Sequence, residues 1–212
     1  DSSGSQPTFT EAAGKVLVER GASIQTHAPA TSTDAGGYAL LLGSEVQNDG
    51  HIGTAKGQTV LGAGDRFYIR KGSGTEGNGF STTFGNEVVP GFKADSSAGK
   101  VSNNGLIQAA TGDITLTGHD VQQNGVLLAS TSVSTRGTLH LLNPATDTGG
   151  RVTLGQGSAT AILLDSSDLT ALDSQHKAAL TGVNANNRVR GDQSRIDIQS
   201  GGSVEFQNGS IT

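Results

Sequence analysis

Carboxylates are the first side chains to consider, because enzymes that cleave polysaccharides use paired acids to bind calcium or to transfer protons. In this 212-residue chain no two aspartates are adjacent. A step of 20 residues, the spacing of a repeat described below, places Asp113 opposite Val133 and Asp120 opposite His140. The nucleophile-elbow, phosphate-loop and His-Glu-x-x-His patterns are also absent. We therefore expect no enzymatic activity, with a polysaccharide-cleaving enzyme as a remote alternative.

Histidines could supply metal ligands, but they form no short pair here and the chain has no cysteine to assist them. No calcium-binding Gly-Gly-x-Gly-x-Asp repeat occurs either. His140 alternates with Leu139 and Leu141, which predicts that its side chain points outward into solvent. The sequence thus predicts no metal site and no cofactor. The five histidines are His27, His51, His119, His140 and His176.

The tripeptide Arg190, Gly191 and Asp192 matches the integrin-binding sequence. Integrins read it at an exposed loop tip, and here it precedes a strand-like segment at 195–198, where a bend is expected. Coincidence in a glycine-rich chain is the simpler interpretation. We expect weak integrin binding at most, and these three residues are candidate binding residues on that basis.

An aromatic-rich segment at 65–99 holds five of the eight aromatic residues. Aromatic faces beside hydrogen-bond donors suit sugar rings, and loops on a rigid scaffold often carry function. Alternatively, the aromatics pack this segment against the rest of the chain. A binding site should leave some of the rings open to solvent near Arg70, whereas packing should bury them all. The candidate ligand-binding residues are Arg66, Tyr68, Arg70, Phe80 and Phe84.

The elements that would position these residues come from a repeat. The pattern Val-x-(Asn/Gln)-(Asp/Asn)-Gly-x-(Ile/Leu) begins at Val46, Val101 and Val121, and the last two copies are 20 residues apart. A unit of this size cannot bury an apolar face alone and needs a neighbour on each side, which is typical of a solenoid. Amides at the bends should hydrogen-bond one another from copy to copy. These amides are Asn48, Asn103, Asn104, Gln123 and Asn124.

Short strands are predicted by a second pattern, a glycine followed by alternating apolar residues, as at 112–116 and 137–141. The strands resemble one another and lack helical connectors, which favours a parallel β-helix over an antiparallel sandwich. Eight to ten turns of the chain are expected in one segment spanning 1–212. Two excursions are expected, the aromatic-rich segment 65–99 and a short helix or loop at 165–182.

Composition narrows the partners. Only 33% of residues are hydrophobic, as suits a rod with a narrow core, and the net charge of −5 argues against nucleic acid. No apolar run reaches the ~18 residues needed to span a membrane. The absence of cysteine suits export in an unfolded state, and the absence of methionine indicates a processed or excised chain.

Several stretches together resemble the filamentous haemagglutinin-like exoproteins of the two-partner secretion family of Gram-negative bacteria. The resemblance covers most of the chain. It is carried by G-G-Y-A-L-L-L-G (36–43), G-Q-T-V-L-G-A-G-D-R-F-Y-I-R (57–70), G-N-E-V-V-P (85–90), G-L-I-Q-A-A-T-G-D-I-T-L-T-G-H (105–119), R-G-T-L-H-L-L-N (136–143), A-L-D-S-Q (171–175) and G-G-S-V-E-F-Q-N-G-S-I-T (201–212).

The resemblance implies a right-handed parallel β-helix that is secreted to the bacterial cell surface through an outer-membrane pore partner. Members act as adhesins, biofilm matrix proteins, haem-acquisition proteins or contact-dependent toxins, and several serve cell adhesion in virulence. We therefore expect a structural shaft segment, monomeric by itself, that displays a distal adhesive or toxic element. The alternative is a module that binds a host receptor or glycan directly. No signal peptide, secretion domain or toxin tip is visible in the sequence.

Overall fold

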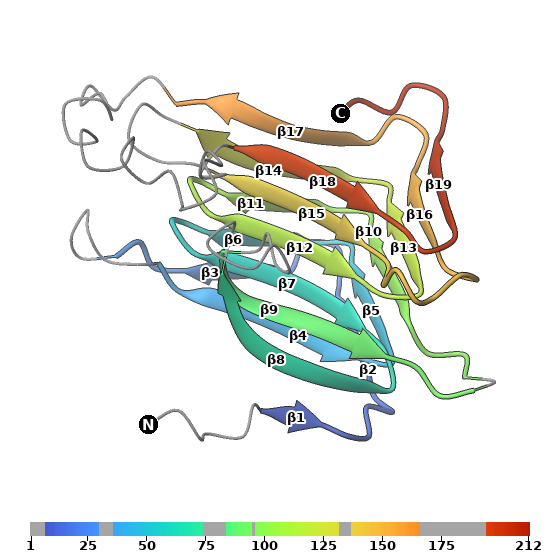
Figure 1. Cartoon of the computed structure of the whole chain (residues 1–212). Helices are drawn as coiled ribbons and strands as arrows, with labels where there is room; N and C mark the ends of the chain where they lie inside the picture. Colours follow the sequence, from blue (N-terminus) through green and yellow to red (C-terminus); the bar gives the residue numbers. More distant parts are fainter. Residues whose placement is uncertain (1–6, 30–35, 74–83, 95, 132–136, 166–193) are drawn as a thin grey trace, which may run out of the picture.

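The described chain is all-β. A computed structural model describes residues 7–29, 36–73, 84–94, 96–131, 137–165 and 194–212, and every element within them is a strand. Three sheets are parallel and the fourth is antiparallel (Figure 1). None of the described residues forms a helix long and apolar enough to cross a membrane. The expected helix or loop at 165–182 falls almost wholly outside the described residues.

The three parallel sheets contain six, five and five strands. The first is built from β2 (Lys15–Val18), β5 (Glu45–Asn48), β10 (Lys100–Asn103), β13 (Asp120–Gln123), β16 (Arg151–Leu154) and β19 (Ser203–Phe206). The second is built from β3 (Ser23–Thr26), β6 (His51–Thr54), β11 (Leu106–Ala109), β14 (Val126–Thr131) and β17 (Ala159–Leu164). The third is built from β4 (Tyr38–Gly43), β7 (Gln58–Ala63), β12 (Asp113–Thr117), β15 (Thr138–Leu142) and β18 (Arg195–Gln199).

The chain visits these sheets in a fixed order. Each strand of the first sheet is followed by one of the second and then one of the third, and we call such a set of three strands a round. The five complete rounds start at β2, β5, β10, β13 and β16, and β19 starts a sixth. The expected eight to ten turns were too many, because the connections between strands are longer than a uniform 20-residue period allows.

The register between rounds follows the repeat. Val101 pairs with Val121, and Ile107 pairs with Leu127, which confirms the stacking predicted from the 20-residue spacing. The column of the first sheet is valine in all six strands. It consists of Val16, Val46, Val101, Val121, Val152 and Val204. Like residues stack on like residues because every round occupies the same position relative to the core.

The core lies on one face of each parallel sheet. Alternate residues of each strand enter it, so Ile114 and Leu116 of β12 are fully buried beside Leu139 and Leu141 of β15. β-Branched and leucine side chains suit these positions because they pack well on a pleated surface. One apolar cluster runs through the rounds, and so the parallel sheets share a single core.

The amides at the bends form two ladders, as predicted. In the buried ladder, Asn48 Nδ2 donates to Asn103 Oδ1 at 2.8 Å, and Asn103 Nδ2 donates to Gln123 Oε1 at 2.8 Å. Gln123 Nε2 then donates to the carbonyl oxygens of Gly125 and Ala159. In the exposed ladder, the Nδ2 atoms of Asn104 and Asn124 donate to Asp49 Oδ1 and Asn104 Oδ1. The buried amides are thereby satisfied, which removes the penalty of placing them in the core.

A row of alternating charges follows the opposite face of the first sheet. Paired positions on successive strands hold Lys15, Glu45, Lys100, Asp120 and Arg151. Lys15 Nζ lies 2.6 Å from Glu45 Oε2, and Arg151 Nη2 lies 2.9 Å from Asp120 Oδ2. These surface pairs are individually weak, but the alternation gives every charge an opposite neighbour and opposes slippage of one strand along the next.

The antiparallel sheet leaves the repeat. It contains β1 (Thr8–Phe9), β8 (Arg66–Ser73) and β9 (Phe84–Gly91), in the order β1-β8-β9. Phe67 and Val88 are buried in a second cluster with Val60 of β7, so β8 and β9 pack on the outer face of the third parallel sheet (Figure 1). The aromatic-rich segment thus contains strands of its own and forms a second layer there.

Candidate binding surfaces

The outward face of β8 carries three of the residues predicted to bind a ligand. Because strand residues alternate, Phe67 and Ile69 pack toward the third parallel sheet, while Arg66, Tyr68 and Arg70 share the other face. Arg66 is exposed, and 42% of Tyr68 is accessible to solvent. The segment therefore both packs and presents: alternate residues bury themselves, and the residues between them stay open.

Arg70 has a partner that the sequence analysis missed. Its Nε and Nη2 atoms donate to Glu87 Oε2 and Oε1 at 2.7 and 2.9 Å, across the β8–β9 pair. The hydrogen bonds from Glu87 raise the pKa of Arg70 above its ordinary value. A bidentate ion pair holds both side chains in place, so Arg66 is the more available cation on this face. The signal was the opposite charge at the paired position, which requires the hairpin register to be known.

The remaining predicted residues are not brought into this face by the described structure. Phe84 is the first residue of β9, which places its backbone opposite Ser73. Phe80 and the tripeptide Arg190, Gly191 and Asp192 lie outside the described residues. The described part of the candidate site is therefore Arg66, Tyr68 and Arg70.

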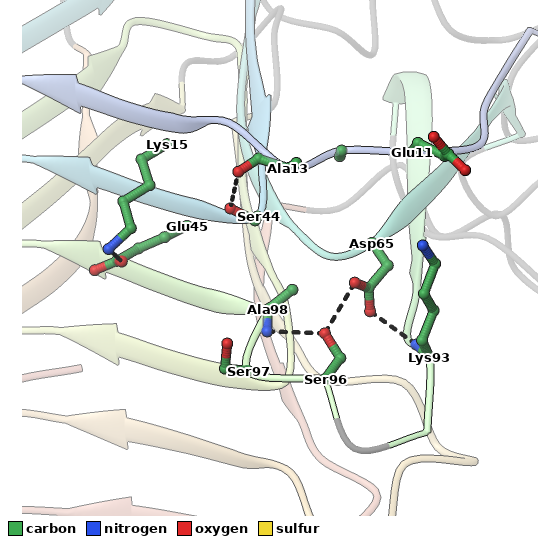
Figure 2. A pocket seen from close by; sticks show the side chains of 11 residues that line it. Glu11, Ala13, Lys15, Ser44, Glu45, Asp65, Lys93, Ser96, Ser97 and Ala98 are labelled. Carbon is green, nitrogen blue, oxygen red and sulfur yellow. Dashed lines mark hydrogen bonds and ion pairs between the residues drawn. The ribbon is translucent and has the colours of Figure 1, made fainter.

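A polar pocket of about 590 Å³ lies beside the hairpin (Figure 2). Its wall comes from the segment that leads into β2, the bend before β5 and the loop that follows β9. Asp65 fixes that loop, since its Oδ2 accepts a hydrogen bond from the backbone N–H of Lys93 and its Oδ1 accepts one from Ser96 Oγ. Ser44 Oγ donates to the carbonyl oxygens of Ala13 and Gly14.

The charged groups of this pocket are largely engaged by one another. The hydrogen bond from Lys15 lowers the pKa of Glu45, which keeps this carboxyl ionised over the physiological range. Asp65 serves backbone and hydroxyl donors. The arrangement provides no nucleophile with an adjacent base, and its visible role is to tie the hairpin back to the parallel sheets.

A buried charged cluster corrects the prediction for His140. The alternation itself is right, because Leu139 and Leu141 are core residues and His140 lies on the other face of the strand, but His140 is fully buried. Its Nε2 lies 2.9 Å from Asp113 Oδ2, and its Nδ1 lies 3.1 Å from Asp197 Oδ2. Arg195 Nε also lies 3.0 Å from Asp197 Oδ2. A solvated surface histidine was therefore the wrong interpretation.

Two aspartates thus gather at one imidazole, although the sequence analysis found no clustered acids. The assumed step of 20 residues fails in the third sheet, where β12 and β15 are related by 25 residues and Asp113 pairs with Thr138. The row Thr115, His140 and Asp197 would have emerged from aligning the strands on their alternating apolar residues. The step is variable because the bends between sheets differ in length while the strands keep their register.

The cluster is a charged structural element closed to large substrates. Burial alone would lower the pKa of His140, but the hydrogen bonds and charges of Asp113 and Asp197 outweigh burial and raise it to about 9. The imidazole is therefore a cation at neutral pH, placed between two carboxylates. Asp113 is 3% exposed, too little to admit a polysaccharide. Within the described residues, no group of three or more His, Cys, Asp or Glu side chains has the geometry to hold a metal ion.

Comparison with known proteins adds no identity to this geometry: no family model matches the chain, and neither a curated protein nor a solved structure is similar to it.

Proposed function

We propose that this chain is a shaft segment of a secreted bacterial exoprotein, in which the three parallel sheets are the faces of a right-handed parallel β-helix. The observation that carries the proposal is the unbroken column of six valines, one per round, in parallel register. Parallel connections that return to the same sheet are right-handed in about 98% of cases, which supports the handedness. Adding rounds to such a stack lengthens it without changing its cross-section.

The resemblance of the sequence to filamentous haemagglutinin-like exoproteins supports the biological setting. On this proposal the chain leaves the bacterium through an outer-membrane two-partner secretion pore and works at the cell surface as part of an adhesin-type protein. It has no nucleic-acid partner, does not insert in a membrane, and is monomeric by itself. A distal element of the parent protein would carry the adhesive or toxic activity.

The side-chain chemistry of the parallel sheets suits a support. The buried amides bind one another, the charges of the first sheet alternate in sign, and the His140 cluster is closed to solvent. Groups committed to each other in this way stiffen a structure and leave few side chains for a substrate. We therefore expect the purified chain to leave polysaccharides uncleaved.

The test is an exchange within the parent exoprotein. The segment 44–155 is replaced by the same length of rounds from an unrelated parallel β-helix, and adhesion or toxin delivery is measured on cells that export equal amounts of both proteins. A shaft predicts that the replaced protein keeps its activity, whereas a deletion of the same segment weakens it by shortening the reach. Loss of activity in the replaced protein would contradict the proposal and indicate that this chain recognises the target itself.

Direct binding is the second candidate function, and the exposure of Tyr68 favours it. The outward face of β8 offers an aromatic ring beside Arg66, the combination expected for contacts to a sugar or a host receptor. If this face binds, Tyr68→Ala and Arg66→Ala should reduce adhesion of the purified chain to cells or immobilised glycans. Leu17→Ala is the matched control, since Leu17 is 53% exposed but lies on the first parallel sheet. Equal adhesion by all three variants would exclude this face.

A further inference from the structure

A second pocket, of about 350 Å³, lies at the bend between the second and third parallel sheets. Its lining includes Tyr38 at the start of β4, Asn86 of β9, and the bend residues Lys56 and Thr111. We call these four residues the bend groove. The groove is separate from the outward face of β8, and its volume is in the lower range of small-ligand sites.

The backbone of the bend groove is strained at two matching places. Lys56 and Thr111 are the non-glycine residues of the described chain with left-handed backbone, at φ values of 50° and 54°. They occupy equivalent positions in successive rounds, each after an alanine and before a glycine. A β-branched residue such as Thr111 rarely adopts this conformation, whereas glycine adopts it without cost.

Stability does not explain why these two positions are not glycine. The glycine that follows each of them is required, because a Cβ atom on Gly57 or Gly112 would collide with the backbone of the preceding round. Thr111 carries a second cost, since its Oγ1 is buried without a hydrogen-bond partner. Strained residues that persist despite such costs concentrate at functional sites, and both of these side chains line the groove.

The walls of the groove are held in place by side chains below them. Gln58, which is 5% exposed, donates from Nε2 to the carbonyl oxygen of Asn86 at 2.6 Å and accepts from the backbone N–H of Asn86 at 2.9 Å. Asp113 accepts hydrogen bonds from Thr115 and Thr138. Because Gln58 and Asp113 are engaged in this way, they position the groove and are not its contact groups.

The groups left to meet a ligand are an aromatic ring and a few neutral donors and acceptors. Tyr38 is 65% exposed although it stands in a row of the third sheet with buried Gln58 and Asp113. The side-chain amide of Asn86 and the ammonium of Lys56 lie on the same groove. No arginine lines it, so the bidentate fork typical of carboxylate and phosphate recognition is missing.

We propose that the bend groove binds one or two rings of a neutral saccharide, with a pyranose ring stacked on Tyr38 and its hydroxyl groups hydrogen-bonded to Asn86 and Lys56. Axial C–H groups of a pyranose form an apolar face that suits an exposed aromatic ring, and amides suit its hydroxyls. This binding site goes beyond the shaft role, and the exchange experiment above is independent of it.

The test is a titration of the ¹⁵N-labelled chain with neutral tetrasaccharides: cellotetraose, maltotetraose and β-1,4-galactotetraose. At least one should bind with millimolar affinity or better and shift the amide signals of Lys56, Asn86 and Gly112. Tyr38→Ala should weaken that binding about tenfold or more, and Tyr38→Phe should retain it. Tyr68→Ala is the matched control, because it removes an exposed tyrosine from another surface and should change nothing.

A second variant separates binding from folding. Thr111→Gly should raise the melting temperature by relieving the left-handed strain, yet weaken saccharide binding by removing a wall of the groove. Three results would overturn the proposal: no binding by any of the three tetrasaccharides at millimolar concentration, binding that survives Tyr38→Ala, or a preference for tetragalacturonate that disappears with salt. The last result would assign the groove to acidic sugars instead.

Discussion

The parallel sheets and the β8–β9 hairpin use the same alternation of residues for different ends. In the parallel sheets, inward positions repeat from round to round, and outward positions of the first sheet, such as Glu45 and Asp120, pair with their neighbours. In the hairpin, inward residues such as Phe67 have no counterpart in the rounds, and outward Tyr68 remains open. Repetition therefore marks side chains needed for stacking, and a departure from it marks side chains released from that requirement.

The largest expected effect tests the repeated core. Leu116→Asp should lower the free energy of unfolding by several kcal/mol and unfold the neighbouring rounds, because Leu116 is fully buried in the core cluster and a carboxylate there would have no partner. Leu17→Asp, on the exposed face of the first sheet, is the control and should change the midpoint of chemical denaturation little. Similar midpoints for the two variants would show that the columns do not determine stability.

A smaller loss is expected when the His140 cluster is opened. His140→Gln removes the cation between two carboxylates, and unpairing a buried charge typically costs about 3–5 kcal/mol. The wild-type cluster should also respond to pH. Since the folded pKa of about 9 exceeds the ordinary value of 6.5, the stabilisation is complete below pH 6.5 and is lost as the pH rises through 9.

Denaturation midpoints measured across that pH window check the sign of the effect. The wild type should lose stability toward alkaline pH, and His140→Gln should show a flatter profile. A wild-type profile that rises between pH 6.5 and 9 would contradict the assignment of His140 as a buried cation.

The buried amide ladder is expected to contribute less than the charged cluster. Asn103→Ala leaves Asn48 Nδ2 without its acceptor and Gln123 Oε1 without its donor, and each orphaned group costs about 1–3 kcal/mol. Asn104→Ala is the matched control in the exposed ladder, where water replaces the lost partner. The difference between the two variants in thermal unfolding measures how much burial adds to an otherwise identical contact.

The smallest effect is expected at the hairpin surface. Arg70→Met removes the ion pair with Glu87, and because Arg70 is 41% exposed the loss should be about 0.5 kcal/mol after solvent screening. Hydrogen exchange should show any loosening confined to β8 and β9, with protection of the parallel sheets unchanged. A change that spread into β7 and β12 would indicate that the hairpin and the stack unfold together.

The sequence was sufficient for the features that repeat. Three copies of one motif aligned Val46, Val101 and Val121, and the same alignment predicted the ladder through Asn48 and Asn103. A stacked unit places identical residues in identical surroundings, so spacing alone determines their contacts.

The features that do not repeat were harder to predict. The antiparallel pairing of β8 with β9, and with it the Arg70–Glu87 contact, depends on a register that no second copy reveals. His140 was misplaced because one spacing was applied to all three sheets, although bend lengths vary freely on a surface while strand register is fixed by the core. The bend groove was missed because left-handed backbone at Lys56 and Thr111 leaves no mark in composition.

The buried ladder of amides also bears on how such a chain could evolve. Its three amides point the same way, and both ends are closed by local backbone, with Asn48 Oδ1 accepting from the N–H of Gly50 and Gln123 donating to Gly125. A tandem duplication of the round that contains Asn103 would insert one more amide that accepts from the asparagine before it and donates to the one after it. The end closures would be untouched, so unequal recombination could change the length of the protein by whole rounds without leaving an unsatisfied polar group in the core.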